Sequence, residues 1–283
     1  MATMHWGHRV ERLPQQALAQ SGPWVRRLAR LGYAAKGVVY ATIGVLALQL
    51  ALGRGGRTTS SRGAIASLAE QPFGALMLGV LSVGLAGYVV WCLAQGLADA
   101  EQKGRSAKGL AIRAGYLASA GVHAGLAVFA LERVVGARRG GGGDHTREWT
   151  ARLMAQPFGR VLVALVGVGV LGFALQQAHD AWKRRFLRNL SLGSLEPRRR
   201  HGVEQVSRFG IAARAVVFAI VGVFLVRAAL DANPREARGL GAALATLAQQ
   251  PYGTVLLGVV AAGLVAYAVY LFLQARYRRI AMA

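Results

Sequence analysis

Long apolar stretches separated by short polar segments dominate the chain, and they predict its main structural elements. Each stretch is close to or above the roughly 20 residues that a membrane-spanning helix needs. None shows the two-residue alternation of apolar and polar positions that a β-barrel strand requires. The stretches lie at residues 33–52, 73–98, 114–135, 158–179, 211–230 and 253–274. We therefore predict an all-α membrane protein with six transmembrane helices.

The predicted spans come in three pairs that repeat one pattern. The first span of each pair opens with a basic residue and a glycine, and the second follows a Gln-Pro-aromatic-Gly corner. Fixed spacing of this kind is typical of an internal repeat. Three hairpins of the same orientation predict a pseudo-threefold axis along the membrane normal. The copies read RLGYAAKGVVY (30–40) with QPFG (71–74), RAGYLASAGVH (113–123) with QPFG (156–159), and RFGIAARAVVF (208–218) with QPYG (250–253).

The repeats divide the chain into segments. Within each repeat, a short amphipathic segment before the corner predicts a short interfacial helix. We expect an N-terminal arm (1–29), repeat 1 (30–99), repeat 2 (113–180), a basic loop (181–207), repeat 3 (208–275) and a tail (276–283), with the arm, loop and tail in the cytoplasm.

The corner itself has a structural interpretation. Its proline would end the short helix and its aromatic ring would sit among the lipid head groups. A direct ligand role for the glutamine is the alternative. The corner residues are Gln71 with Pro72, Gln156 with Pro157, and Gln250 with Pro251.

Charge adds an orientation to this picture. The chain carries a formal charge of +22, and arginine supplies 30 of its 34 basic residues, a bias that suggests a bacterial source. Twenty Lys and Arg residues lie in the arm, the tail and the loops after the second and fourth spans, against nine in the other loops. The positive-inside rule thus predicts a bacterial inner-membrane protein with cytoplasmic termini. The first 30 residues lack the apolar core of a signal peptide.

The basic clusters also bear on partners. Lys and Arg neutralise nucleic-acid phosphates, but anionic head groups explain the same charges at about 1 kcal/mol for each residue near the membrane surface. We expect membrane lipids as partners, leave a membrane-protein partner open, and expect no nucleic acid. The candidate head-group ligands are Lys183, Arg184, Arg185 and Arg188.

The sequence offers no support for enzymatic chemistry. Cys92 is the single cysteine, and the six histidines do not fall at a metal-binding spacing such as HExxH. Neither a phosphate-binding loop nor a nucleophile motif occurs in a strand-to-helix setting. We expect no catalytic residues, no metal and no cofactor.

Alignment of the repeats brings a set of intramembrane polar residues to two neighbouring depths. Lys36, Ser119 and Arg214 share one position, and Tyr40 and His123 share the position one turn deeper. His123 lies near the midplane, where an ionisable group is costly and is by default a functional candidate. The alternatives are that Lys36 and Arg214 snorkel to the interface and that neutral His123 bonds a neighbouring helix. These five residues form the candidate site.

Small and aromatic residues also recur after each corner. The small residues predict close helix packing, and we assign the aromatic residues to packing as well. Ten and fourteen positions after the corner glycine lie Gly84 and Tyr88, Gly169 and Phe173, and Gly263 and Tyr267.

The tandem R-x-G-[YI] helix starts and QP[FY]G corners, in three copies across nearly the whole chain, resemble the bacterial membrane proteins of domain-of-unknown-function family 1206. The resemblance implies a triplicated two-helix membrane unit with no assigned reaction, so it carries over no functional residues. The second copy departs from the others, because Ser119 stands where they have Lys36 and Arg214.

Two classes of function remain open. The first is a non-catalytic scaffold or accessory subunit that engages lipid or a partner complex. The alternative is a small transporter or channel with a central polar level at His123, Lys36 and Arg214. The absence of mid-span Asp and Glu favours the scaffold, whereas a cavity that reaches His123 would favour transport.

Overall fold

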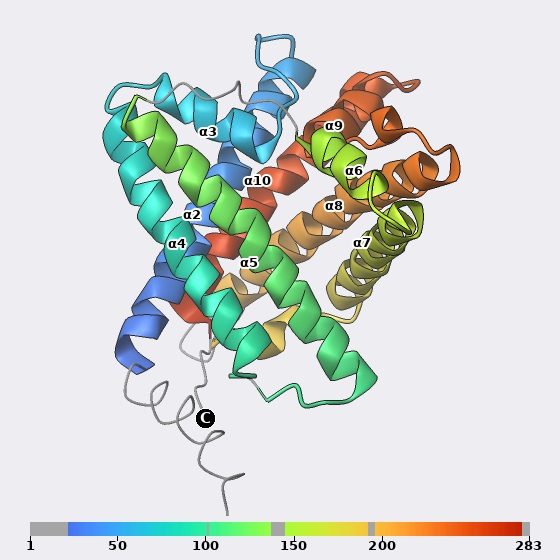
Figure 1. The fold of residues 1–283 in the computed structure, drawn as a ribbon. Coiled ribbons are helices and arrows are strands. Elements are labelled where there is room, and N and C mark those ends of the chain that lie inside the picture. Colours follow the sequence, from blue (N-terminus) through green and yellow to red (C-terminus); the bar gives the residue numbers. More distant parts are fainter. Residues whose placement is uncertain (1–21, 101, 137–144, 192–195, 279–283) are drawn as a thin grey trace, which may run out of the picture.

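The computed structural model describes residues 22–100, 102–136, 145–191 and 196–278, and the regular structure in these ranges is helical (Figure 1). Six of the described helices are long and apolar enough to cross a membrane. They are α2 (Gly22–Ala51), α4 (Gly74–Leu97), α5 (Ala107–Val134), α7 (Gly159–Trp182), α8 (Pro197–Leu230) and α10 (Gly253–Tyr277). Short helices α3 (Ser61–Ala69), α6 (Thr146–Met154) and α9 (Leu240–Ala248) lie within the three repeats. The predicted all-α fold with six spans is confirmed.

Several helices extend past the predicted segments. Helix α2 begins at Gly22, inside the predicted arm, and α8 begins at Pro197, inside the predicted basic loop. Proline is well suited to a first helical position because its missing amide hydrogen has no partner to lose there. The rest of that loop includes a 3₁₀ turn, η1 (Arg185–Asn189). Residues 1–21 of the arm and 279–283 of the tail lie outside the described residues.

The Gln-Pro-aromatic-Gly corner forms the same tight turn in all three repeats. The glutamine carbonyl accepts a hydrogen bond of 2.7 to 2.9 Å from the amide of the motif glycine. The aromatic residue between them has a φ of 60° in each copy, a left-handed conformation that costs a non-glycine residue about 1–2 kcal/mol. The membrane helix then begins at the glycine, which lies against carbonyl oxygens of the preceding short helix where a Cβ would clash.

The three corners lie at the same end of the bundle, with α3, α6 and α9 (Figure 1). Their aromatic rings, Phe73, Phe158 and Tyr252, are 82–85% exposed. Such exposure fits the predicted contact with head groups, and the shared end is what three hairpins of one orientation require. We call this end the corner end.

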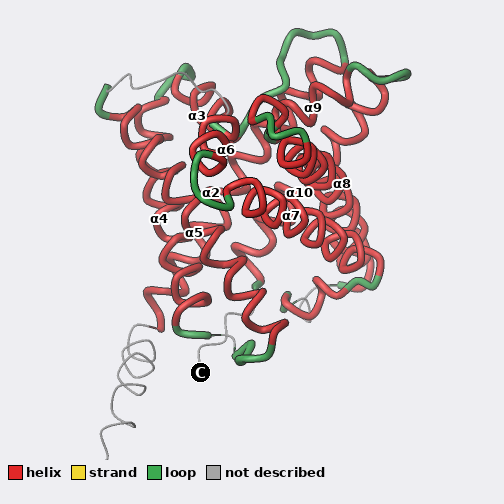
Figure 2. Tube along the Cα trace, turned by 45° about the vertical axis from the view of Figure 1, so that its right-hand side comes forward, coloured by secondary structure: helices red, strands yellow, loops and turns green. Residues whose placement is uncertain are grey.

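The six spans form an open ring in the order α5, α4, α2, α10, α8, α7 (Figures 1 and 2). Between repeats, the first span of one repeat packs against the second span of another. Each of these contacts involves a small residue of the first span. Gly44 of α2 lies against α10, and Gly222 of α8 lies against α7. At the matching Ala127 of α5, the backbone carbonyl accepts a hydrogen bond from Ser82 of α4. Helices α5 and α7 are the two ends of the ring, and they scarcely touch.

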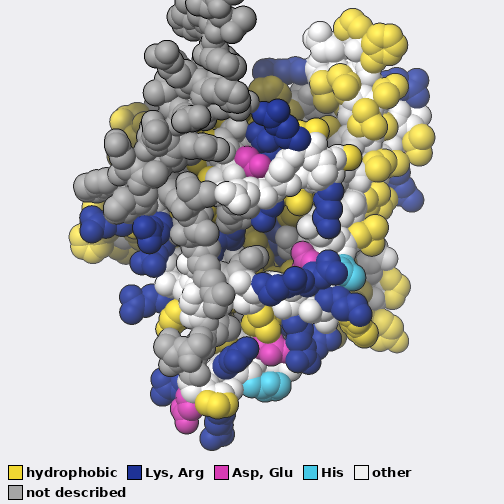
Figure 3. All heavy atoms as spheres, turned by 90° about the horizontal axis from the view of Figure 1, so that it is seen from below, with side chains coloured by type: hydrophobic (Ala, Val, Ile, Leu, Met, Phe, Trp, Pro, Cys, Tyr) yellow, Lys and Arg dark blue, Asp and Glu magenta, His cyan; other side chains and the backbone are white. Residues whose placement is uncertain are grey.

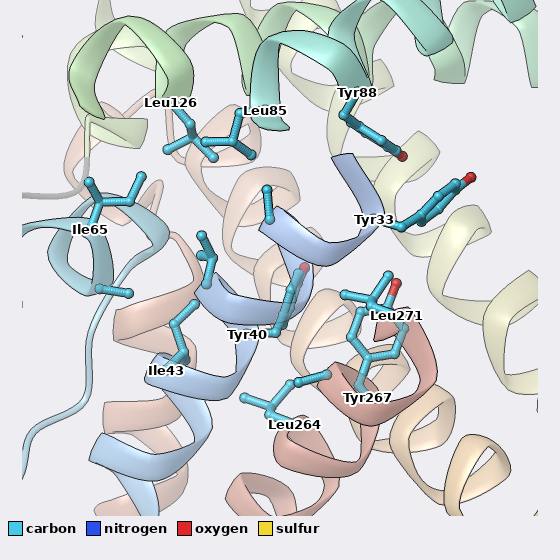
Figure 4. Close-up of a cluster of buried hydrophobic side chains, with 14 of the residues drawn as sticks. Tyr33, Tyr40, Ile43, Ile65, Leu85, Tyr88, Leu126, Leu264, Tyr267 and Leu271 are labelled. Carbon is cyan, nitrogen blue, oxygen red and sulfur yellow. The ribbon is translucent and has the colours of Figure 1, made fainter. Parts of the chain in front are cut away.

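Short segments pack over the bundle at the corner end and at the opposite end. At the corner end, Ile65 of α3 is fully buried and lies near Leu85 of α4 and Leu126 of α5 (Figure 4). At the opposite end, η1 and the residue after it bury Phe186 and Leu190 beneath the ring. The Phe186 ring packs edge-on against a tyrosine of α10, with centroids 5.8 Å apart. The core therefore extends beyond the spans at both ends.

Candidate functional site

Lys36 turns into the ring and does not snorkel to an interface. Its side chain is only 7% exposed, and Nζ donates a 2.9 Å hydrogen bond to the hydroxyl of Tyr88 on α4. The same ammonium lies 4.1 Å from the centre of the Tyr88 ring. This bond uses one of the three donors of the ammonium group.

Arg214 of α8 is also buried, at 8% exposure, and lies inside a cage of four aromatic rings. Its Nε donates a 3.1 Å hydrogen bond to the hydroxyl of Tyr40 on α2. Aromatic faces attract a cation electrostatically, and the attraction reaches about 2 kcal/mol in desolvated sites. The Arg214 Cζ atom lies 4.4 Å from the ring centre of Phe218, 4.9 Å from Tyr267, 5.1 Å from Phe173 and 5.7 Å from Tyr40.

Tyr40 links Arg214 of α8 to the helix that carries Lys36. It lies one turn after Lys36 on α2 and packs edge-on against Tyr267 of α10, with ring centroids 4.9 Å apart (Figure 4). Lys36 and Arg214 thus approach the same interior region from α2 and α8.

His123 of α5 faces the Lys36 side of this region and is half-buried. Its ring stacks at an angle on Tyr88, with centroids 4.7 Å apart. The Nδ1 atom lies 2.7 Å from the backbone carbonyl of Ser119. Because a carbonyl oxygen only accepts, Nδ1 carries the hydrogen in this pair, and Nε2 of the neutral ring remains an acceptor. Among the described residues, this hydrogen bond of His123 lies within α5, whereas the sequence left open a bond to a neighbouring helix.

No carboxylate balances the two cations within the described residues. Ion pairs there involve other residues, such as Arg184 with Glu204 and Arg238 with Glu236. Among the described residues, Arg214 donates a single side-chain hydrogen bond, to Tyr40, although a guanidinium carries five N–H donors. Because a buried cation is costly unless it is paired, the level is suited to a negative charge.

Every span contributes to this region, which we call the cationic level. The sequence predicted Lys36, Tyr40, Ser119, His123 and Arg214, and the structure brings them together around the ring interior. The prediction assigned Tyr88, Phe173 and Tyr267 to packing alone, although they contact the cations. Their recurrence one helix turn beyond the packing glycines, in repeats that also carry basic residues, is the signal that could have identified them.

The candidate head-group ligands lie at the opposite end from the corners. Lys183, Arg184, Arg185 and Arg188 are all exposed around η1. Arg184 is engaged at 2.8 Å with Glu204 of α8. Lys and Arg side chains are numerous on this face of the molecule (Figure 3), so head-group binding there stays a prediction that the surface allows.

The fold and the cationic level define a multi-pass helical membrane protein built from three tandem repeats. The chain belongs to the family described as Domain of Unknown Function (DUF1206), whose model matches residues 31–99, 114–184 and 209–278. This match confirms the resemblance and the three repeats. The chain is also 37% identical, over 92% of its length and 93% of the relative's, to a protein named Uncharacterized protein YxxB from Bacillus subtilis (strain 168). No solved structure matches this chain.

Proposed function

We propose that this protein is a non-enzymatic membrane protein that binds an anion inside the bilayer, as the substrate site of a small transporter. The observation that carries the proposal is the pair of buried cations, Lys36 and Arg214, without a carboxylate partner among the described residues. The unused donors of both groups would bind the anion.

A scaffold or accessory subunit would not require this arrangement. A protein that only presents surfaces to lipid or to a partner complex gains nothing from two unbalanced cations in its interior, because their burial costs free energy. The aromatic cage lowers that cost for Arg214, but aromatic faces do not accept a full set of hydrogen bonds. The cationic level therefore favours anion binding over the scaffold, which remains the competing proposal.

We expect anions to stabilise the folded protein through Arg214. The purified protein in phosphatidylcholine nanodiscs would be heated with increasing sodium phosphate or dodecyl phosphate, at constant ionic strength. Saturating ligand at 100 times Kd contributes about 2.7 kcal/mol, which corresponds to a rise in Tm of about 5 °C or more. This rise should disappear in Arg214→Met.

Arg227→Met provides the matched control, because Arg227 lies on the same helix and is exposed. We expect the control variant to keep the full anion response. If neither anion stabilises the wild-type protein, or if both variants respond as the wild type does, anion binding at Arg214 is excluded and the scaffold is favoured.

The orientation of the protein follows from its charge asymmetry. We propose that the termini and the η1 face lie in the cytoplasm of a bacterial cell, with the corners outside, because the η1 side carries most of the Lys and Arg. Single cysteines at Arg185 and Phe73, in a Cys92→Ala background, would be tested with a membrane-impermeant maleimide on intact cells. We expect labelling at position 73 only. Labelling at position 185 and not at position 73 would reverse the assignment.

A further inference from the structure

Two of the three hairpins are closed by glycines that bring their helices into contact. In repeat 1, a Cβ added to Gly84 of α4 would lie 2.7 Å from the Cβ of Ala35 on α2. In repeat 3, a Cβ added to Gly263 of α10 would overlap the Cβ of Ala213 on α8. The first span of each of these repeats has a second close contact. A Cβ added to Gly32 would clash with the backbone of Tyr88, and one added to Gly210 would clash with the backbone of Tyr267. Side chains at these positions would separate the helices.

Repeat 2 carries the same small residues but leaves its hairpin open. Gly115 of α5 and Gly169 of α7 are the counterparts of the residues above, and a Cβ added to either meets nothing within 4 Å. The same is true of Gly172, one turn after Gly169. The faces that pack in the other repeats are thus exposed along both α5 and α7, and the ring is interrupted between them.

Residues of the cationic level are partly exposed at this interruption. Phe173 of α7 lies next to Arg214 and is still 38% exposed. On α5, His123 is half-buried beside Tyr88. The aromatic and imidazole rings at this edge thus stand between the surrounding membrane and the two cations.

Short segments pack over the bundle at the corner end and at the opposite end. Helix α3 buries Ile65 at the corner end, and α9 buries Leu244 there. Gly241 of α9 lies against the backbone of Thr59 and Ser60, so α3 and α9 adjoin one another. At the opposite end, Phe186 and Leu190 belong to the same buried cluster as the spans. A molecule that reaches Arg214 by the side would come from the hydrocarbon region of the bilayer.

We infer that the ligand of the cationic level is an anionic amphiphile, which enters from the bilayer between α5 and α7 with its head group towards Arg214 and Lys36 and its chain in the opening. The inference rests on the proposed anion site and adds the substrate class and the route. Charge complementarity selects the head group, and the exposed apolar and glycine faces of α5 and α7 select a hydrocarbon chain over a hydrated ion.

The test compares ligands that share a head group but differ in the chain. Thermal stability of the protein in phosphatidylcholine nanodiscs would be measured with dodecyl phosphate and with inorganic phosphate. We expect dodecyl phosphate to act at concentrations at least 100-fold lower. Dodecyl trimethylammonium controls for partitioning of the chain into the bilayer and should give no stabilisation. Loss of the dodecyl phosphate response in Arg214→Met would tie the effect to the cationic level.

The route is tested by position. A dodecyl phosphate analogue with a diazirine on its chain would be photo-crosslinked to the nanodisc protein, and the labelled peptides would be identified by mass spectrometry. We expect labels that depend on Arg214 to concentrate on α5 and α7, and to fall about tenfold in Gly169→Trp, which fills the opening. Val168→Trp, a neighbouring exposed position on α7, is the matched control and should label normally.

Three outcomes would overturn the inference. If inorganic phosphate is as potent as dodecyl phosphate, the anion site stands but its ligand is a soluble ion. Labels spread evenly over all six spans would rule out the opening as the route. A dimer whose contact lies along α5 and α7, detected by mass photometry and cysteine cross-linking, would assign the exposed faces to a second copy of the chain.

Discussion

Gly84→Leu and Gly263→Leu are expected to prevent stable folding, whereas Gly169→Leu, at the same position of repeat 2, is expected to leave the protein folded. The first two glycines lie against Ala35 and Ala213, so a leucine would force α4 from α2 and α10 from α8. Overpacking by one or two methylenes already costs about 1–3 kcal/mol, and a whole leucine exceeds that. Gly169 faces open space, and replacing a mid-helix glycine adds up to about 1 kcal/mol of helix propensity.

The three variants would be compared by yield and thermal unfolding after purification in detergent. We expect little or no monodisperse protein from Gly84→Leu and Gly263→Leu, or a Tm at least about 10 °C below that of the wild type, and an unchanged or slightly higher Tm for Gly169→Leu. If Gly169→Leu is as damaging as the others, α5 and α7 pack together in the membrane as the other hairpins do. The opening and the lateral route would then be abandoned.

The spans and their grouping were predictable from the sequence because they depend on local patterns. Apolar length predicts a span, and a corner such as Gln71-Pro72 predicts where the chain reverses. The structure confirms six spans and places the three corners at one end. The left-handed aromatic residue in the corner was not predicted, because a phenylalanine gives no sign of a positive φ in the way that a glycine does.

The interruption of the ring was not predictable from the same patterns. Gly115 and Gly169 have the spacing of their counterparts in repeats 1 and 3, so the sequence of repeat 2 describes a hairpin that could close. Whether it closes depends on the angles at which the five other neighbouring helix pairs of the ring pack. Those angles are set by the bundle as a whole. The sequence signs that repeat 2 differs were the replacement of a basic residue by Ser119 and a glycine tract at 140–143.

The segment around η1 shows a different limit of sequence patterns. Its density of Lys and Arg suggested a solvated loop that contacts head groups. Phe186, Leu187 and Leu190 are interspersed with basic residues in that segment, and Phe186 and Leu190 are buried beneath the ring. A few apolar residues in a short basic stretch carry too little periodicity to predict burial.

The cationic level permits a second prediction of large effect, in which the missing negative charge is supplied by the protein. The Phe218 ring centre lies 4.4 Å from Cζ of Arg214, so a carboxylate at position 218 would reach the guanidinium. We expect Phe218→Glu to be more stable than its neutral isostere Phe218→Gln. Both variants lose the same ring, and the difference between them isolates the charge.

The attraction between unit charges 4 Å apart is about 4 kcal/mol at an effective dielectric constant of 20. Desolvation of the new carboxylate removes part of that gain, because a buried ion pair costs several kcal/mol to dehydrate. Arg214 has already been dehydrated by the fold, so only the carboxylate adds a new cost. We therefore expect Phe218→Glu to exceed Phe218→Gln by about 2 kcal/mol in unfolding free energy.

The internal carboxylate should also compete with the external ligand. Thermal unfolding in nanodiscs, with and without dodecyl phosphate, would show a stabilised Phe218→Glu that no longer responds to the anion and a Phe218→Gln that still responds. Should Phe218→Glu be the less stable variant, or respond to dodecyl phosphate as strongly as Phe218→Gln does, the four aromatic rings would already satisfy Arg214. Its burial would then be structural, and the level would have no vacancy for an anion.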